Sequence, residues 1–132
     1  MASTMGFVVV VVLGLSGATG AVARFAFSEW ATKHWQEIFP LPTLLINVTG
    51  AFALGLLMTI GGTSGTLAQI RLLLGTGFLG GYTTFSTLSF DTHSLFRSRQ
   101  TGAAWLNSLG SLALGVAAAA LGMVCGSLIR LP

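Results

Sequence analysis

The chain has 132 residues, of which 53% are apolar and only 7% are charged. A typical soluble domain has about 25% charged residues, so this sequence has too few polar side chains to cover a water-facing surface. We therefore predict an integral membrane protein and exclude a disordered chain, a collagen, a coiled coil and a soluble enzyme. The net charge of +3 comes from six basic and three acidic side chains, too few for a nucleic-acid-binding surface.

Four apolar stretches are long enough to cross a membrane, since a hydrocarbon core about 30 Å thick requires about 20 helical residues. They cover about residues 6–27, 42–60, 67–95 and 103–129. The linkers between them are too short for a soluble domain, so we predict a single four-helix transmembrane domain over residues 1–132. The longest linker, Glu29 to Leu41, carries Trp30 and Trp35 beside charges, which is typical of a membrane interface.

The first apolar stretch could be a helix of the mature protein or a cleaved signal peptide. Residues Ala21 to Ala23 resemble a cleavage site, but residues Met1 to Met5 carry no Lys or Arg. A signal peptide needs basic residues in that region, so we expect a retained helix.

The basic residues give only a small bias in membrane orientation. An even number of spans places both ends of the chain on one side, together with Arg71 and Arg130. The other side holds four basic residues, namely Arg24, Lys33, Arg97 and Arg99. Under the positive-inside rule, such a chain can insert either way. This favours a dual-topology protein whose subunits pair as an antiparallel dimer.

Small residues recur at helical spacing in the second and fourth stretches. The pairs are Ala51-xxx-Gly55, Ser111-xxx-Gly115 and Gly122-xxx-Gly126. Such pairs let helix backbones approach closely in lipid, so we predict tight helix packing at these positions.

Asn47 lies near the middle of the second stretch, where a polar side chain is costly and marks a site or an interhelical contact. Its amide can donate two hydrogen bonds and accept two. The sequence leaves open whether Asn47 joins two helices or binds a transported species.

The segment from Gly77 to Asp91 combines three glycines with a cluster of hydroxyl residues, namely Thr83, Thr84, Ser86, Thr87 and Ser89. We predict that the third helix breaks near Gly80 to Thr83, although a glycine-softened helix whose hydroxyls bond their own backbone is an alternative. Broken helices are tolerated at membrane depth only in a protein interior or beside a water-filled cavity, and they expose backbone groups that bind small ions.

The polar groups near this break are neutral and rich in donors. Phe85 and Phe90 lie beside them, and aromatic ring edges carry partial positive charge. Hydroxyls, an amide and ring edges could replace the water around a small anion without binding it too tightly for release. Asp91 lies either at a pore mouth or at the membrane interface. We find no spacing typical of an enzyme active site, and His34 and His93 are not spaced as metal ligands.

Three motifs closely resemble those of the bacterial fluoride channel family, called Fluc or CrcB. They are Gly20-Ala-x-x-Arg24, Thr43-x-x-x-Asn47-x-x-Gly50 and Gly77-Phe-Leu-Gly-Gly-x-Thr-Thr-Phe-Ser-Thr. The third is the most specific, and the resemblance covers essentially the whole chain.

The resemblance implies an all-α protein of the bacterial inner (plasma) membrane, with a break in the third of four transmembrane helices. It implies a dual-topology antiparallel dimer with two pores, which exports cytoplasmic fluoride by passive conduction. Fluoride enters cells as the neutral weak acid and is trapped when it ionises, so a fluoride-selective channel lowers its toxicity.

The resemblance also assigns roles to individual residues. Asn47 matches the asparagine that donates to fluoride, and Phe85 matches the first ring of a paired-ring site. Gly80 and Thr83 match the break whose backbone carbonyls hold a structural Na⁺ at the dimer axis. The remaining matches are a line of pore hydroxyls (Ser86, Thr87, Ser111 and Thr43), the vestibule acid Asp91 and the first-helix arginine Arg24.

Two positions depart from the family's pattern. Leu88 stands where a second phenylalanine is common, and Asn107 stands where a tyrosine is often found. Leucine has no quadrupole, so one ring-edge contact to an anion is lost, and Phe90 lies two residues later on another helix face. These departures allow a heterodimer with a paralogous subunit in place of the homodimer.

An alternative function is a proton-coupled small multidrug exporter, which is also a small four-helix, dual-topology dimer. Such an exporter requires a membrane-embedded carboxylate in the first helix, and residues 6–27 contain none. We therefore favour the fluoride channel.

Overall fold

The computed structural model describes residues 2–35, 39–60 and 65–129. These residues form helices and connecting turns, with no β-strand among them. In chain order the elements are α1 (Ala2–His34), α2 (Leu41–Thr59), α3 (Gly65–Arg71), the π-helical segment η1 (Leu72–Leu79), α4 (Gly80–Tyr82), α5 (Phe85–Arg97), α6 (Thr101–Trp105), the π-helical segment η2 (Leu106–Gly110) and α7 (Ser111–Leu128). The predicted all-helical fold is confirmed.

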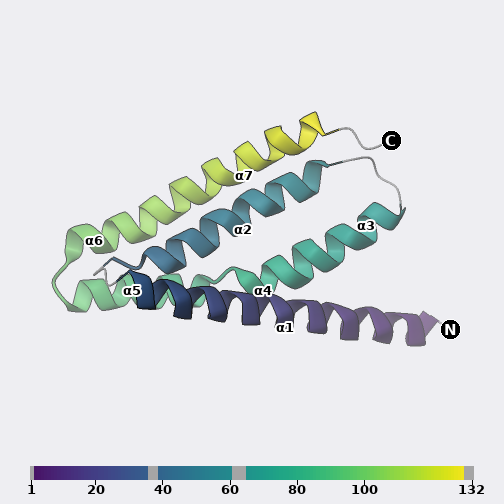
Figure 1. Cartoon of the computed structure of the whole chain (residues 1–132), viewed down its shortest axis with the longest axis horizontal. Coiled ribbons are helices and arrows are strands. Elements are labelled where there is room, and N and C mark those ends of the chain that lie inside the picture. Colours follow the sequence, from purple (N-terminus) through teal and green to yellow (C-terminus); the bar gives the residue numbers. More distant parts are fainter. Residues whose placement is uncertain (1, 36–38, 61–64, 130–132) are drawn as a thin grey trace.

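The helices form two packed pairs that run roughly lengthwise (Figure 1). Helix α2 packs along α7, and α1 packs along η1 and α4. Helix α1 begins and α7 ends at the same end of the molecule, while α5 and α6 lie at the opposite end (Figure 1). Arg130, one of the basic residues that bear on membrane orientation, lies outside the described residues.

Within the described residues, three unbroken helices are long and apolar enough to cross a membrane, namely Gly6–His34, Leu41–Thr59 and Thr101–Leu128. The predicted third span, 67–95, is not one of them because its helix is interrupted after Tyr82. That these two pieces together form a fourth span stays a prediction.

The interruption lies at Thr83 and Thr84, which both have extended backbones (φ −75°, ψ 158° and φ −147°, ψ 122°). The predicted break in the third helix is therefore confirmed, at the C-terminal edge of the expected region. Gly80 and Gly81 remain helical in α4, so the glycines precede the break and the threonines form it.

The C-terminal end of α1 differs from the prediction. The expected linker began at Glu29, but α1 continues to His34. Lys33 lies 3.7 Å from Glu29 one turn earlier, and two basic residues in the last turn complement the helix dipole. The Trp30 ring also lies 4.9 Å from the His34 ring, so the aromatic cluster belongs to a helix.

Close backbone packing through glycine joins each pair of helices. A Cβ added at Gly55 would collide with the carbonyl oxygen of Ala119, and one at Gly122 would collide with that of Phe52. The predicted tight packing at Gly55 and Gly122 is thus confirmed, and the structure shows that it joins α2 to α7. The Ser111-xxx-Gly115 prediction is wrong within this chain, because a Cβ at Gly115 would meet no atom within 4 Å.

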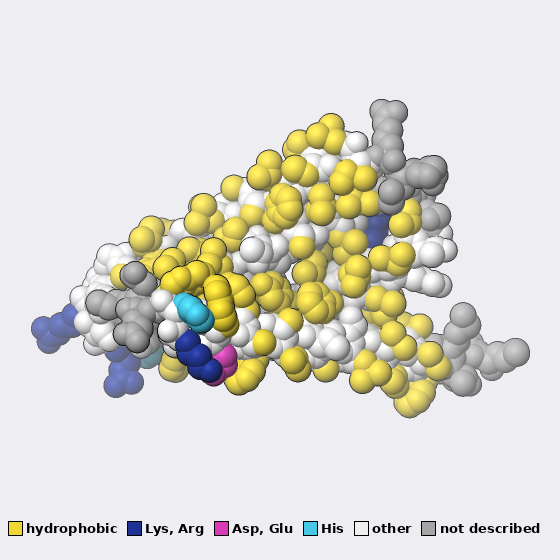
Figure 2. Space-filling model, viewed as in Figure 1, with side chains coloured by type: hydrophobic (Ala, Val, Ile, Leu, Met, Phe, Trp, Pro, Cys, Tyr) yellow, Lys and Arg dark blue, Asp and Glu magenta, His cyan; other side chains and the backbone are white. Residues whose placement is uncertain are grey.

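Many large apolar side chains lie on the outer surface, as expected for a protein in lipid. Figure 2 shows hydrophobic side chains over most of one face, with charged side chains gathered mainly at one end. The buried apolar residues are few, namely Ala31, Ile46, Leu79, Leu95 and Ala104, whereas Phe7, Val10, Phe25, Leu112 and many others are exposed. A helix surface of this kind is stable only against lipid or another protein.

Candidate functional site

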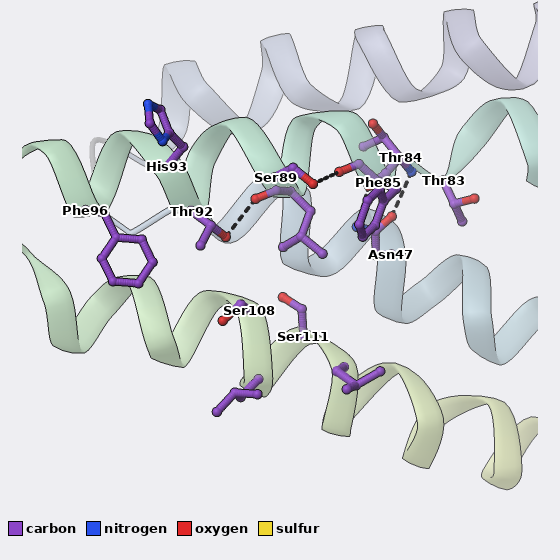
Figure 3. Close-up of a pocket in the computed structure, with 13 residues that line it drawn as sticks. Asn47, Thr83, Thr84, Phe85, Ser89, Thr92, His93, Phe96, Ser108 and Ser111 are labelled. Atoms are coloured by element: carbon purple, nitrogen blue, oxygen red, sulfur yellow. Dashed lines mark hydrogen bonds between the residues drawn. The ribbon is translucent and has the colours of Figure 1, made fainter.

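A groove of about 730 Å³ separates α5 from the helix formed by η2 and α7. One face of α5 supplies residues spaced by three or four positions, and Ser108 and Ser111 face it from the other side (Figure 3). The lining residues are Asn47, Thr83, Thr84, Phe85, Leu88, Ser89, Thr92, His93, Phe96, Ser108, Leu109, Ser111 and Leu112. The groove thus combines neutral hydroxyl and amide groups with apolar walls.

Asn47 forms two hydrogen bonds with the peptide groups of a single residue at the helix break. Its Nδ2 donates to the carbonyl oxygen of Thr84 over 2.9 Å, and its Oδ1 accepts from the Thr84 N–H over 2.8 Å (Figure 3). The sequence left open an interhelical contact or a binding role. Asn47 does join α2 to the break, and it also lines the groove.

Thr84 supplies the N-cap of α5. Its Oγ1 accepts from the Thr87 N–H over 3.1 Å and lies 2.9 Å from the Thr87 hydroxyl. An extended N-cap whose side chain satisfies a first-turn N–H is the usual way to begin a helix. The side chain of Thr84 therefore fixes the start of α5, while its peptide groups hold Asn47.

The other side of the break is held by Arg24 and Gly50. The Arg24 Nε donates to the carbonyl oxygen of Gly81 over 3.2 Å. A Cβ at Gly50 would collide with the side chain of Thr83, so α2 needs glycine there to let the break approach. Arg24 thus acts within the chain as a cap for the end of α4, and an attraction of anions stays a prediction.

A second hollow of about 290 Å³ lies against the same break. Gly80 and Thr83 line it, as does Asn47 from the opposite wall. In an unbroken helix the carbonyl of Gly80 would accept from the N–H of Thr84, but that N–H donates to Asn47 instead. The carbonyl of Gly80 is therefore released from its usual helical partner. Asn47 and Thr83 line both hollows.

Thr43 and Asp91 lie together but outside the groove lining. The Thr43 hydroxyl donates to Asp91 Oδ2 over 2.7 Å, which joins the first turn of α2 to the middle of α5. Ser86 and Thr87 also lie outside the lining, near the cap of α5. The pore roles of these four residues stay predictions.

Asn107 is fully buried in η2. Its Nδ2 donates to the Thr92 hydroxyl over 2.9 Å and to the carbonyl of Leu88 over 3.5 Å. Asn107 therefore ties η2 to α5 behind the groove. Ser111 does line the groove, one turn further along.

Leu88 occupies the groove face one turn after Phe85, as the sequence suggested, and Phe90 is absent from that face. Phe85 and Phe90 are 81% and 71% exposed. The polar residues Thr84, Ser89, Thr92, His93 and Ser108 also line the groove. The sequence analysis placed Thr84 and Ser89 in the hydroxyl cluster without giving either its own role, and it assigned Thr92, His93 and Ser108 to no site. The helical spacing of Ser89, Thr92 and His93 from Phe85 on α5 was the signal that could have identified these three.

Residues 10–123 match the model of a family described as "CrcB-like protein, Camphor Resistance (CrcB)". The chain belongs to the CrcB family. All three motifs noted in the sequence, and the whole groove face of α5, lie within the matched residues.

Curated relatives in the CrcB family resemble the chain over most of its length. The "Fluoride-specific ion channel FluC" of Roseiflexus sp. (strain RS-1) is 42% identical over 114 residues, covering 86% of this chain and 92% of the relative. The "Fluoride-specific ion channel FluC 1" of Leifsonia xyli subsp. xyli is 42% identical over 124 residues, covering 94% and 90%. The "Fluoride-specific ion channel FluC 2" of Bacillus cereus (strain ATCC 10987 / NRS 248) is 41% identical over 112 residues, covering 85% and 92%.

Proposed function

We propose that this protein is a fluoride-selective channel that exports cytoplasmic fluoride by passive conduction. Its relatives in the CrcB family are named fluoride-specific ion channels. They are named as channels and not as enzymes. The proposal therefore rests first on family membership over residues 10–123.

The observation that carries the proposal is the position of Asn47 at the break, on the wall of both hollows. A neutral amide and neighbouring hydroxyls can replace part of the water shell of a small anion. Among the described residues, the groove lining contains no Lys, Arg, Asp or Glu, and its one titratable side chain is His93. A wall of hydroxyl and amide donors without a Lys or Arg binds an anion weakly enough to release it, as conduction requires.

The proposed channel is an antiparallel, dual-topology dimer of four-helix subunits. In one subunit the groove is only partly enclosed, and Phe85 is mostly exposed. An anion in that groove would meet lipid, which is strongly unfavourable for a charge. A second subunit would enclose the path. We propose a homodimer, and the Leu88 and Asn107 departures make a heterodimer with a paralogous subunit the alternative.

Within such a dimer, Asn47 and the Phe85 ring edge would contact fluoride, with Leu88 beside them. The hydroxyls would continue the path, and Asp91 would lie near its mouth. The hydroxyls in question are those of Thr43, Ser86, Thr87 and Ser111, with Asn107 fixing the helix behind them.

A structural Na⁺ is proposed at the dimer axis, held by the backbone carbonyls of Gly80 and Thr83. Two features support this fit. The carbonyl of Gly80 is released from its helical donor because Thr84 N–H bonds Asn47, and a Cβ at Gly80 would meet no atom within 4 Å. Carbonyl oxygens at a helix break are suitable ligands for a small cation. Na⁺ would supply positive charge that holds two breaks together.

The three apolar helices support a multi-pass membrane location, and we propose the bacterial inner (plasma) membrane. A proton-coupled exporter is not favoured. The acidic residue of α1, Glu29, lies near the end of the helix and pairs with Lys33, so it is not an embedded proton carrier.

The test is fluoride efflux from liposomes that contain the purified full chain alone. A fluoride electrode follows the efflux, and a potassium ionophore balances the charge. We expect fast release of fluoride and not of chloride. Release of neither ion from liposomes that contain the folded dimer would contradict the homodimeric channel, and restored release on adding a paralogous subunit would establish the heterodimer.

A further inference from the structure

The feature from which we argue is the paired hydrogen bonding between the amide of Asn47 and the peptide groups of Thr84. The extended backbone of Thr84 (φ −147°, ψ 122°) turns its own N–H and C=O to the same side, as in a β-strand. Asn47 Oδ1 accepts from that N–H over 2.8 Å, and Nδ2 donates to that carbonyl over 2.9 Å. A rotation of the amide by 180° would place oxygen against oxygen and N–H against N–H.

The geometry of a planar amide decides which group is left free. The hydrogen of Nδ2 that lies cis to Oδ1 is on the side facing Thr84, so it makes the bond to the Thr84 carbonyl. The second hydrogen lies trans to Oδ1, and its bond points opposite to the Cγ=Oδ1 bond. Asn47 therefore has one uncommitted N–H donor, and its carbonyl oxygen is turned away from the direction of that donor.

We infer that Thr84 is a positioning residue that sets the ion preference of the channel, by locking the Asn47 amide so that an N–H, and not the oxygen, faces the ion path. This inference rests on the proposed function, because it takes the two hollows beside Asn47 as parts of that path. A freely rotating amide would present its oxygen part of the time, and an oxygen repels an anion and attracts a cation.

The fixed orientation of the Asn47 amide depends on the N-cap of α5, which the Thr84 side chain forms. Thr84 is buried, and its Oγ1 accepts from the Thr87 N–H and contacts the Thr87 and Ser86 hydroxyls at 2.9 and 3.3 Å. These contacts hold the Thr84 backbone extended. Without the cap, the first turn of α5 frays and the two peptide groups no longer face Asn47 together.

The experiment is NMR of the full chain in lipid nanodiscs, labelled with ¹⁵N only at asparagine. The sequence contains only two asparagines, Asn47 and Asn107, so two pairs of amide hydrogens are observed and the Asn107→Asp variant assigns them. For Asn47 in wild type, we expect the cis hydrogen to exchange slowly with water. On titration with sodium fluoride, we expect the trans hydrogen to shift and the cis hydrogen to stay. Equal exchange of the two, or a fluoride shift of the cis hydrogen, would overturn the inference.

Variants of Thr84 distinguish its effect on the orientation of the Asn47 amide from a general structural role. Thr84→Ala should speed exchange of the Asn47 cis hydrogen about fivefold, the loss typical of a removed N-cap, and should lower the ratio of fluoride to chloride efflux. Thr84→Ser keeps the cap and should restore both. Thr32→Ala is the matched control, since the Thr32 hydroxyl bonds only the Ser28 carbonyl within α1. Unchanged exchange in Thr84→Ala would contradict the inference.

The exchange measurement needs no fluoride, so it separates the two claims. A protected cis hydrogen in a wild-type protein that passes no fluoride would refute the proposed function, while the fixed orientation of the Asn47 amide would still hold. An unprotected cis hydrogen in a protein that conducts fluoride would refute the fixed orientation of the Asn47 amide, while the proposed function would still hold.

Discussion

The Thr43 hydroxyl donates to Asp91 Oδ2 over 2.7 Å and so joins the start of α2 to the middle of α5. Thr43 is buried and Asp91 is partly buried, which limits the access of water to the carboxylate. A short hydrogen bond to a charged acceptor is among the stronger polar contacts in proteins. This pair therefore fixes α5 against α2 through two residues that lie outside the groove lining.

Thr43→Val should destabilise the folded protein by about 1–2 kcal/mol, because the Asp91 carboxylate loses a buried donor. The measurement is thermal or denaturant unfolding of the purified protein in detergent. Asp91→Asn alone and the double variant complete a double-mutant cycle, for which we expect a coupling energy of about 0.5–3 kcal/mol. A coupling energy of zero would show that the two residues do not stabilise each other.

Asn47→Asp should slow fluoride efflux at least about hundredfold, because a carboxylate repels an anion with several kcal/mol at close range. The same variant cannot donate to the Thr84 carbonyl, so it should also loosen the break. Efflux from liposomes gives the rate, and circular dichroism with size-exclusion chromatography verifies the folded dimer. Unchanged efflux in a folded Asn47→Asp protein would eliminate the assigned role of Asn47.

Leu88→Phe should keep or raise the fluoride efflux rate. Leu88 lies on the groove face one turn after Phe85, so an aromatic ring there would add a second partly positive edge beside the anion path. Phe90→Leu is the matched control, since Phe90 is exposed and outside the groove lining, and it should leave efflux unchanged. A large loss in Leu88→Phe would show that the groove is packed around leucine.

Gly122→Ala should destabilise the protein by about 1–3 kcal/mol, since α2 and α7 would have to separate. The added Cβ would collide with the carbonyl oxygen of Phe52, which is backbone and cannot move aside. Gly14→Ala is the control, because a Cβ at Gly14 would meet no atom within 4 Å; it should stabilise α1 by about 0.5–1 kcal/mol. Equal unfolding midpoints for the two variants would contradict the assigned packing.

The positions of the helices followed from composition and spacing. Apolar runs of about 20 residues and their polar interruptions predicted α2 as Pro42–Ile60, close to the observed Leu41–Thr59. The prediction failed at the end of α1, where Glu29 and Lys33 looked like a linker but support one more turn. Charge ends an apolar pattern without ending a helix, so hydropathy alone could not place His34 inside α1.

The candidate site was only partly predictable, for a similar reason. The amide of Asn47 and the hydroxyls after Gly81 indicated a polar break in an apolar helix, and this needed no knowledge of the fold. The partner of Asn47 could not be predicted, because 37 positions separate it from Thr84 along the chain. Likewise the sequence did not show that Asp91 contacts Thr43 of α2 while Leu88, one turn earlier on α5, lines the groove, because only the tertiary packing decides what lies beside each residue of α5.

By itself, the sequence determined that this protein is helical, lies in a membrane and breaks its third apolar stretch, because those properties depend on hydropathy and on local backbone preferences. Only the tertiary structure decided that Thr84 is the residue that Asn47 holds, that Arg24 caps α4 and that Thr43 binds Asp91. Each of these contacts joins segments distant in sequence. The polar groups freed at a helix break must find partners inside lipid, and only the packing of α1 and α2 against the break brings those partners within reach.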